Sequence, residues 1–385
     1  MKKMFKKLTV LMITCAMLLN LTACGNANYT ADNTEYVIGF SGPLTGDAAV
    51  YGVAVKNSAQ MAVDEINAAG GLNGVKFKLV ATDDTHDATK VATNYSSMYE
   101  GGMQVSLGTV TTAPGLEFSK LSAEDNVFFL TPSASGDAIP EKDNGFQMCF
   151  ADGNQGKVAA DYVNSIGIKK IGIFYKSDDA YSNGIYKQFK ENLDPSIETV
   201  ETVFTGNAQD FSAQISNLKD CTFIFMPIYY QPASVFMTQA KDIIAKDAVY
   251  YGCDGFDGLA GQFEDFSVIP QEVSMLSHFD SNATSGAAAD FVQKYTEQYG
   301  ADTLNQFGAS AYDCVYAIYN AMKAASDAGE DINVTMSASD LSDILKKQFT
   351  GDFSYSGVTG TDITWEASGY VSKEAVKYTL KSANN

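Results

Sequence analysis

The sequence predicts an α/β protein built from two doubly wound, parallel-sheet lobes that are joined by a hinge. Short apolar strands alternate with helices from Tyr36 onward, a pattern typical of parallel sheets covered by helices on both faces. The alternation restarts near Asn154, which indicates a second unit of similar size. The length of 385 residues also exceeds that of one typical domain.

The first unit is expected to begin with an apolar strand that leads into a turn-rich loop and an amphipathic helix. Apolar and small residues recur at helical spacing from Ala54 to Ile66, and Gly70-Gly71 ends the helix. The remaining elements expected here are a strand at 75–82, a helix at 88–100, a strand at 105–107, a helix at 116–123 and a strand at 127–130.

The second unit repeats this order, and the later chain is more helical. Its expected strands lie at 170–175, 198–204, 222–226 and 249–251, between helices at 156–166, 184–193, 210–218 and 233–245. Helices at 286–299, 309–325 and 338–347 follow, and then strand-like segments at 361–365 and 375–380. A chain that returns to cover an earlier lobe crosses between the lobes more than once, which predicts a hinge beside a cleft.

Open parallel sheets bind ligands beyond the carboxyl ends of their strands. The loops at those ends are rich in Ser, Thr, Tyr and Gly, and helices begin just after several of them. Backbone N–H groups at such helix starts can hold an anion. The loops are 41–46, 108–114, 131–137, 176–181, 227–232 and 252–258.

The chain contains no arginine, the residue that commonly grips a ligand carboxylate through two bonds. Hydroxyls, backbone amides or a lysine must then hold an anionic group, and Thr112, Ser133 and Ser135 lie in suitable loops. A cationic group would need Asp254, backbone carbonyls or an aromatic face. The candidate aromatic faces are Tyr51, Tyr181, Tyr229 and Tyr230.

Charge excludes nucleic acid as a partner, because its binders need a basic surface. The formal net charge is −20, and removal of the four N-terminal lysines with a cleaved signal would leave 22 lysines against 46 acidic residues, or −24. The same excess speaks against basic docking on anionic lipid. No motif calls for a cofactor, and a small molecule is the expected ligand.

The N-terminus resembles a bacterial lipoprotein signal. A basic segment at 1–7 precedes an apolar stretch at 8–21, which ends in Leu21-Thr22-Ala23-Cys24-Gly25. The resemblance implies cleavage before Cys24 and acyl chains such as palmitate on that cysteine, which hold the protein at the cell membrane. The polar run 26–35 would act as a tether. The alternative is an ordinary secretory signal, and both place the protein outside the cytoplasm.

The sequence leaves two questions open: the state of the cysteines in the body and the role of the acidic residues around His86. The body contains four widely spaced cysteines, which allow three disulfide pairings or free buried thiols and disfavour a zinc site. They are Cys149, Cys221, Cys253 and Cys314. His86 stands among Asp83, Asp84 and Asp87 as a metal cluster would, but a solvated loop is the favoured interpretation, so no metal site is expected.

Several runs together resemble the amino-acid-binding proteins of ABC importers, of the branched-chain (leucine/isoleucine/valine) type. They are Ile38-Gly-Phe-Ser-Gly-Pro-Leu-Thr-Gly46, Tyr51-Gly52, Ala62-Val-Asp-Glu-Ile-Asn-Ala-Ala-Gly-Gly-Leu-Asn-Gly74 and Asp83-Asp84. The resemblance extends over nearly all of 36–380. It implies the type I periplasmic binding protein fold, with a ligand held between the lobes and a closed form that docks on a membrane permease.

The resemblance also implies domain boundaries. After a signal peptide at 1–23 and a tether at 24–35, the N-terminal lobe comprises 36–153 and 279–373. The C-terminal lobe comprises 154–278 and 374–385, and three crossovers join the lobes. The protein is expected to act as a monomer that is attached to the membrane only through its lipid.

The family's ligand contacts fall on positions where the local pattern matches. Tyr51 would pack on the ligand, the Thr112 hydroxyl would hold its carboxylate, and Asp254 would pair with its ammonium group. The loop Ser133-Ala134-Ser135 would bind both ligand ends, and Tyr181 and Tyr229 would contribute from the second lobe. Asp254 is one methylene shorter than the glutamate of some relatives, so the side chain of the amino acid stays open.

Other interpretations compete with these assignments. The two serines could cap a following helix, and Asp254 could form an Asx turn with Gly255. A ligand-sensing receptor for a short amide or other small polar solute is the alternative function. A serine hydrolase has the least support, because the chain has two histidines and lacks G-x-S-x-G, so no enzyme activity is expected.

Overall fold

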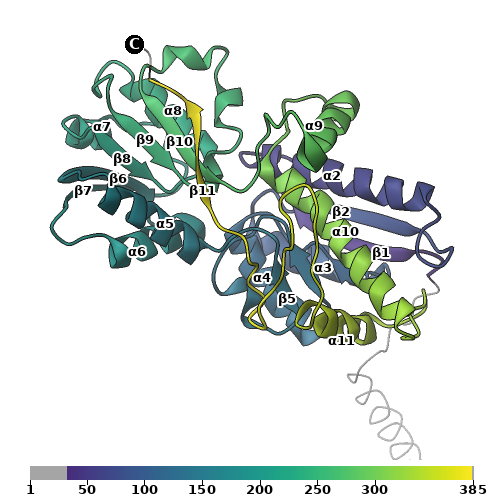
Figure 1. The fold of residues 1–385 in the computed structure, drawn as a ribbon. Helices are drawn as coiled ribbons and strands as arrows, with labels where there is room; N and C mark the ends of the chain where they lie inside the picture. Colours follow the sequence, from purple (N-terminus) through teal and green to yellow (C-terminus); the bar gives the residue numbers. More distant parts are fainter. Residues whose placement is uncertain (1–32, 384–385) are drawn as a thin grey trace, which may run out of the picture.

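The computed structural model of the protein describes residues 33–383, so the signal segment, Cys24 and most of the tether lie outside the described residues. Figure 1 shows two lobes side by side, each a sheet flanked by helices, with several chain segments running between them. The predicted fold class of two α/β lobes is therefore confirmed. Within 33–383, no helix has the length and apolar character needed to cross a bilayer.

The first lobe contains a five-stranded, all-parallel sheet in the order β2-β1-β3-β4-β5. Its inner strand β1, which lies between β2 and β3, is buried along its whole length, as expected for a parallel strand with helices on both faces. The strands are β1 (Tyr36–Gly42), β2 (Phe77–Asp83), β3 (Val105–Ser106), β4 (Phe129–Thr131) and β5 (Gly145–Gln147). The helices are α2 (Ala49–Ala68), α3 (Val91–Glu100), α4 (Thr112–Glu124), α9 (Gly286–Tyr299), α10 (Gln306–Asp327) and α11 (Ala338–Phe349).

The second lobe contains a six-stranded sheet in the order β11-β10-β9-β8-β6-β7. Its strands are β6 (Lys170–Lys176), β7 (Glu198–Phe204), β8 (Phe223–Met226), β9 (Val249–Gly252), β10 (Glu272–Ser277) and β11 (Val376–Lys381). Its helices are α5 (Asp152–Ser165), α6 (Ala180–Asn192), α7 (Ser212–Leu218) and α8 (Tyr230–Ala240). The edge strand β11 runs antiparallel to β10, so this sheet is mixed rather than purely parallel.

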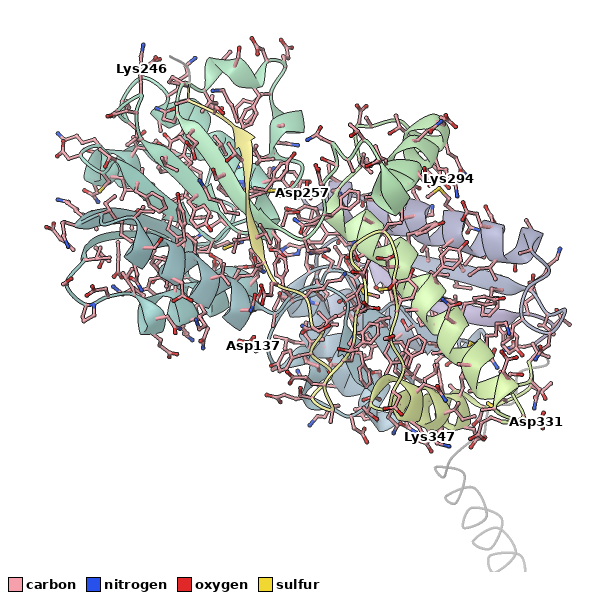
Figure 2. All side chains as sticks on the ribbon, in the orientation of Figure 1. Asp137, Lys246, Asp257, Lys294, Asp331 and Lys347 are labelled. Atoms are coloured by element: carbon pink, nitrogen blue, oxygen red, sulfur yellow. The ribbon has the colours of Figure 1, made fainter. Side chains whose placement is uncertain are left out.

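The chain passes between the lobes three times. It leaves the first sheet after β5 for α5, and it returns after β10 to α10, which packs on α2. The last passage leads from Trp365, whose indole N–H donates to the Gln147 carbonyl at 2.7 Å, to β11 in the second sheet. In Figure 2, Asp137 and Asp257 lie close to the junction of the two lobes.

Several predicted elements differ from the structure. Strands β5 and β10 were not predicted, and within the described residues 361–365 forms isolated bridges at Ile363 and Trp365 rather than a strand. The helix predicted at 116–123 begins earlier, at Thr112, because Pro114 is tolerated in a first helical turn. The helix predicted at 309–325 begins at Gln306, since the Asn305 side chain accepts the N–H groups of the next turn.

Candidate functional site

Seven of the eight predicted ligand-contact residues are buried, with exposed fractions of 5% or less, and Tyr229 is partly buried. All except Tyr51 lie beyond the carboxyl ends of strands: Thr112 after β3, 133–135 after β4, Tyr181 after β6, Tyr229 after β8 and Asp254 after β9. Tyr51 belongs to α2 in the first turn of that helix. The loops of both sheets therefore meet between the lobes.

Asp254 is buried in a short 3-10 helix (Asp254–Phe256) and is bonded through both its side chain and its backbone. The Tyr181 hydroxyl donates to its Oδ1 at 2.7 Å, and the Asp254 N–H donates to Gln155 Oε1 at 3.0 Å. Burial raises the pKa of Asp254 to about 7, although the bonds from Tyr181 and Gln155 lower it. A buried carboxyl of this kind ionises readily only when a cation comes beside it.

Several hydrogen bonds join the lobes directly, and two of them lie at the loop that follows β9. The Tyr51 hydroxyl donates to the Gly255 carbonyl at 2.6 Å, and the Gln306 N–H donates to Asp257 Oδ2 at 2.9 Å. Tyr51 and Gln306 belong to first-lobe helices, while Gly255 and Asp257 follow β9 of the second lobe. The cleft is therefore shut in this structure.

An aromatic cluster fills the space between the lobes. Tyr181 and Tyr229 stack with ring centroids 4.6 Å apart, and Tyr51 meets Tyr230 edge-on at 4.9 Å. Tyr51 also meets Phe307 at 4.8 Å. Sequence reasoning missed Phe307, which lies in the first turn of α10 rather than after a strand. Its position two residues after the capping residue Asn305 was the only sequence signal.

Thr112 is the first residue of α4, and its side-chain Oγ1 is buried without a hydrogen-bond partner. Its backbone N–H lies close enough to the Tyr229 hydroxyl to lower the pKa of that hydroxyl, which burial raises. His86 packs edge-on against Tyr229 at 5.4 Å, and its Nδ1 lies 2.8 Å from Thr111 Oγ1. The start of α4 thus faces Tyr229 across the cleft.

The three residues of the loop 133–135 bond to different parts of the protein. The Ser133 hydroxyl donates to the Val110 carbonyl at 2.8 Å, and the Ala134 carbonyl accepts from Gln147, so both residues bond within the first lobe. Ser135 instead accepts the Asp152 N–H through its carbonyl at 2.8 Å. Neither serine caps a helix, because the next helical turn, Ile139–Glu141, is preceded by Ala138. The capping interpretation is therefore wrong.

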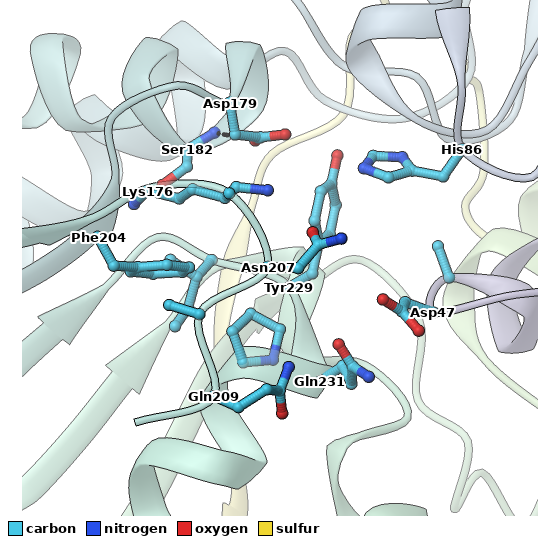
Figure 3. A pocket seen from close by; sticks show the side chains of 15 residues that line it. Asp47, His86, Lys176, Asp179, Ser182, Phe204, Asn207, Gln209, Tyr229 and Gln231 are labelled. Carbon is cyan, nitrogen blue, oxygen red and sulfur yellow. Dashed lines mark hydrogen bonds between the residues drawn. The ribbon is translucent and has the colours of Figure 1, made fainter. Parts of the chain in front are cut away.

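A cavity of about 70 Å³ lies beside Tyr229 and is lined from both lobes. Figure 3 shows His86 and Asp47 of the first lobe facing Tyr229 and Asn207 of the second lobe across it. Lys176 and Asp179 also line it. Thr112, Ser135 and Asp254 do not, because in the shut cleft they pack against protein.

The acidic segment near His86 is a folded turn rather than a solvated loop. Asp84 is fully buried, where its Oδ1 accepts the His86 N–H at 2.9 Å and its Oδ2 accepts the Ser41 hydroxyl at 3.2 Å. Burial raises the pKa of Asp84 to about 6. Among residues 33–383 no cluster of His, Cys, Asp or Glu has metal-binding geometry. The four cysteines of the body are free and buried.

The chain was compared with known proteins. The family model described as "Periplasmic binding protein" matches residues 35–364. The chain is 30% identical over 290 residues to the Leu/Ile/Val-binding protein BraC3 of Rhizobium johnstonii, a match that covers 72% of this chain and 77% of that protein.

Solved structures share the architecture. A branched-chain amino acid transporter substrate-binding protein, LivJ from Streptococcus pneumoniae in complex with isoleucine, superposes with a TM-score of 0.78 at 26% identity, covering 91% of this chain and 96% of that one. A solute-binding protein of an ABC transporter from Rhodopseudomonas palustris, in complex with 3,4-dihydroxybenzoic acid, gives a TM-score of 0.77 at 17% identity over 91% and 94% of the two chains. The second similarity shows the fold alone.

Proposed function

The chain belongs to the periplasmic binding protein family, and on that premise we propose that it captures a branched-chain or other apolar amino acid between its lobes and delivers it to the membrane permease of an ABC importer. The family is one of extracytoplasmic solute-binding proteins rather than enzymes. We propose further that the protein acts as a monomer and that its closed form docks on the permease.

One arrangement carries the proposal: a buried carboxyl of the second lobe and a helix start of the first lobe both lie at the cleft. Asp254 and Tyr181 supply the acidic side from the second lobe, and Thr112 at the start of α4 supplies N–H and hydroxyl donors from the first. Burying a zwitterion is costly unless both of its charges are paired. Asp254 suits an ammonium group, and the α4 start suits a carboxylate.

The same contacts would drive closure. The bond from Tyr51 to Gly255 forms only when the lobes meet, and a ligand that bonds to both lobes adds to it. To shift a mostly open population to a mostly closed one, the ligand must favour the closed form by about 5 kcal/mol. Rings of Tyr51, Tyr181 and Phe307 would surround an aliphatic side chain.

The acyl anchor at Cys24 is proposed from the signal sequence. Growth of the source cells with labelled palmitate should label the protein, and Cys24→Ser should abolish the label and release the protein from the membrane fraction. Continued membrane retention of Cys24→Ser would contradict the anchor.

A thermal-shift screen against the twenty amino acids, followed by isothermal titration calorimetry of the hits, tests the function. We expect an apolar amino acid to raise the melting temperature and to bind with one-to-one stoichiometry. The screen includes short amides and 3,4-dihydroxybenzoate. Binding of one of these without binding of any amino acid would overturn the proposal and favour the alternative of a small polar solute.

A further inference from the structure

The three passages between the lobes converge on the side chain of His278. This residue follows β10 in the second passage, and its Nε2 lies 2.7 Å from the Ser310 hydroxyl of α10 in the first lobe. Its ring meets Phe150 of the first passage edge-on, with ring centroids 5.3 Å apart. His278 and Lys373 of the third passage together line a groove of about 430 Å³. A hinge motion changes the backbone angles of such passages, so it would alter the surroundings of this ring.

The second ring nitrogen of His278 has no partner. Nδ1 is buried and makes no hydrogen bond. A neutral ring carries one N–H, and the contact with Ser310 suits a proton on either nitrogen, because a hydroxyl both donates and accepts. A protonated ring carries two, so Nδ1 would become an N–H donor buried without an acceptor. An unpaired buried donor is costly, so this arrangement favours the neutral ring.

A positive charge near His278 also opposes protonation. Lys373 lines the same groove, and its Nζ donates to Thr359 Oγ1 at 2.5 Å. Burial lowers the pKa of Lys373 to about 8, although the charge of Asp313 raises it, so this ammonium is charged near neutral pH. Burial, followed by the charge of Lys373, lowers the pKa of His278 well below its ordinary value.

The other titratable groups near the hinge do not offset Lys373. On α10, the Asp313 carboxylate is already held by the N–H of Thr359 at 2.8 Å. In the first passage, Cys149 is a buried thiol whose pKa is raised by burial, so it stays neutral. Within residues 33–383, burial and the Lys373 charge account for the lowered pKa of His278. The remaining charged groups that line the groove are Asp280, Asp362, Glu374 and Lys377.

We propose that His278 is a proton-sensitive lock of the hinge: the neutral ring holds the passages in the closed arrangement, and protonation shifts the protein toward an open form that releases its ligand. This inference goes beyond the proposed function, because it concerns the hinge rather than the contacts with the ligand. It applies to any solute that the closed cleft holds.

The direction of the effect follows from proton linkage. In the closed form the pKa of His278 lies well below 6.5, whereas a ring freed by separation of the passages has the ordinary value of about 6.5. The open form therefore binds the proton more tightly. The closed form has its full advantage above about pH 7 and loses it as the pH falls below about 6.5. Ligand affinity, which depends on the closed form, should fall on acidification.

The test measures ligand affinity by calorimetry at about pH 7.5 and about pH 5.5, in the wild type and in His278→Gln. The glutamine amide can still bond to Ser310 but does not titrate. The probe is L-isoleucine or, where it does not bind, the tightest-binding solute of the thermal-shift screen. The comparison cancels buried carboxyls such as Asp254, which titrate in both proteins. From about pH 7.5 to about pH 5.5, the wild type should lose about tenfold more affinity than the variant.

Two results would overturn the lock. His278→Gln and the wild type lose the same fraction of their affinity on acidification if the role of His278 is only structural. Alternatively, the excess loss disappears in His86→Gln, which removes the only other histidine of the chain, and persists in His278→Gln. Binding of a solute other than an amino acid would overturn the proposed function, while the same ratio would still decide the role of His278.

Nuclear magnetic resonance of the wild type covers the case in which His278→Gln does not fold. The chain contains two histidines, so a histidine-labelled sample gives two ring signals, which His86→Gln assigns. The ligand-saturated protein should keep the His278 ring neutral down to about pH 5, and the ligand-free protein should protonate it at a pH closer to 6.5. Identical titration curves with and without the ligand would overturn the inference.

Discussion

The Tyr181 hydroxyl bonds both to the Asp254 side chain and to the backbone N–H of Gly255. It donates to Asp254 Oδ1 at 2.7 Å and accepts the Gly255 N–H at 2.9 Å. Tyr181 lies in the first turn of α6 and Asp254 follows β9, so two separate segments of the second lobe are held together at the cleft. The Gly255 carbonyl in turn accepts the Tyr51 hydroxyl of the first lobe.

Tyr181→Phe should therefore weaken both folding and ligand binding. The change leaves a buried acceptor and a buried N–H without this partner, which costs about 1–3 kcal/mol in the free energy of unfolding. Urea unfolding and calorimetry measure the two effects. Tyr186→Phe in the same helix is the control, because its hydroxyl bonds to Glu201 at the surface. Equal losses in the two variants would contradict a special role for Tyr181.

Asp254→Ala should reduce the affinity for the amino acid by about 2–5 kcal/mol, since it removes one partner of a buried charge pair. The side chain is 2% exposed, so water cannot easily take its place. Calorimetric titration of the wild type and the variant measures the difference. Unchanged affinity would reject Asp254 as the ammonium partner.

Stability should depend on pH through Asp254. Burial raises the pKa of Asp254 to about 7, well above its ordinary value near 4, so the folded protein holds this proton more tightly than the unfolded chain. The resulting stabilisation is fully present below about pH 4 and is lost as the pH rises through about 7.

Without ligand, the wild type should thus lose up to about 4 kcal/mol relative to Asp254→Asn between these limits. The comparison with the variant removes the contributions of other carboxyls, which titrate in both proteins. Melting temperatures of the two proteins across the pH range provide the measurement. Parallel curves would show that Asp254 does not titrate as its burial implies.

Thr112→Val should separate binding from stability. The Thr112 hydroxyl oxygen is buried without a partner, so its replacement by a methyl group should leave the ligand-free protein equally stable or slightly more stable. Affinity should fall by about 1.5–3 kcal/mol if the hydroxyl bonds to a ligand carboxylate. Circular dichroism melts and titrations measure the two quantities, and unchanged affinity would exclude this contact.

Gly255→Ala should destabilise the interlobe junction because there is no room for the added methyl group. A Cβ at Gly255 would lie 2.7 Å from the Tyr181 hydroxyl and 3.0 Å from the Ile228 carbonyl, so Tyr181 would have to move from Asp254. We expect about 1–3 kcal/mol of destabilisation and weaker binding. Gly261→Ala is the control, because nothing lies within 4 Å of a Cβ there. If Gly255→Ala and Gly261→Ala have the same free energy of unfolding and the same ligand affinity, the close packing around Gly255 would be contradicted.

The sequence alone was sufficient to predict the architecture of two α/β lobes. Alternation of apolar strands with helices is a local pattern, and parallel strands place their carboxyl ends at one edge, so the loops of Thr112, Tyr181 and Asp254 could be placed at the interlobe edge in advance. Strands β5 and β10 escaped prediction because Gly145–Gln147 is short and because Glu272–Ser277, although largely buried, lacks the continuous apolar run expected of a buried parallel strand.

The pairing of side chains was decided only by the tertiary structure. No spacing indicated that Ser133 bonds inward to Val110 or that Phe307 packs on Tyr51. Strand and helix periodicity arise from neighbours a few residues apart. Burial and side-chain pairing instead depend on segments that are distant in the sequence, such as those of Tyr51 and Phe307, which tertiary packing brings together.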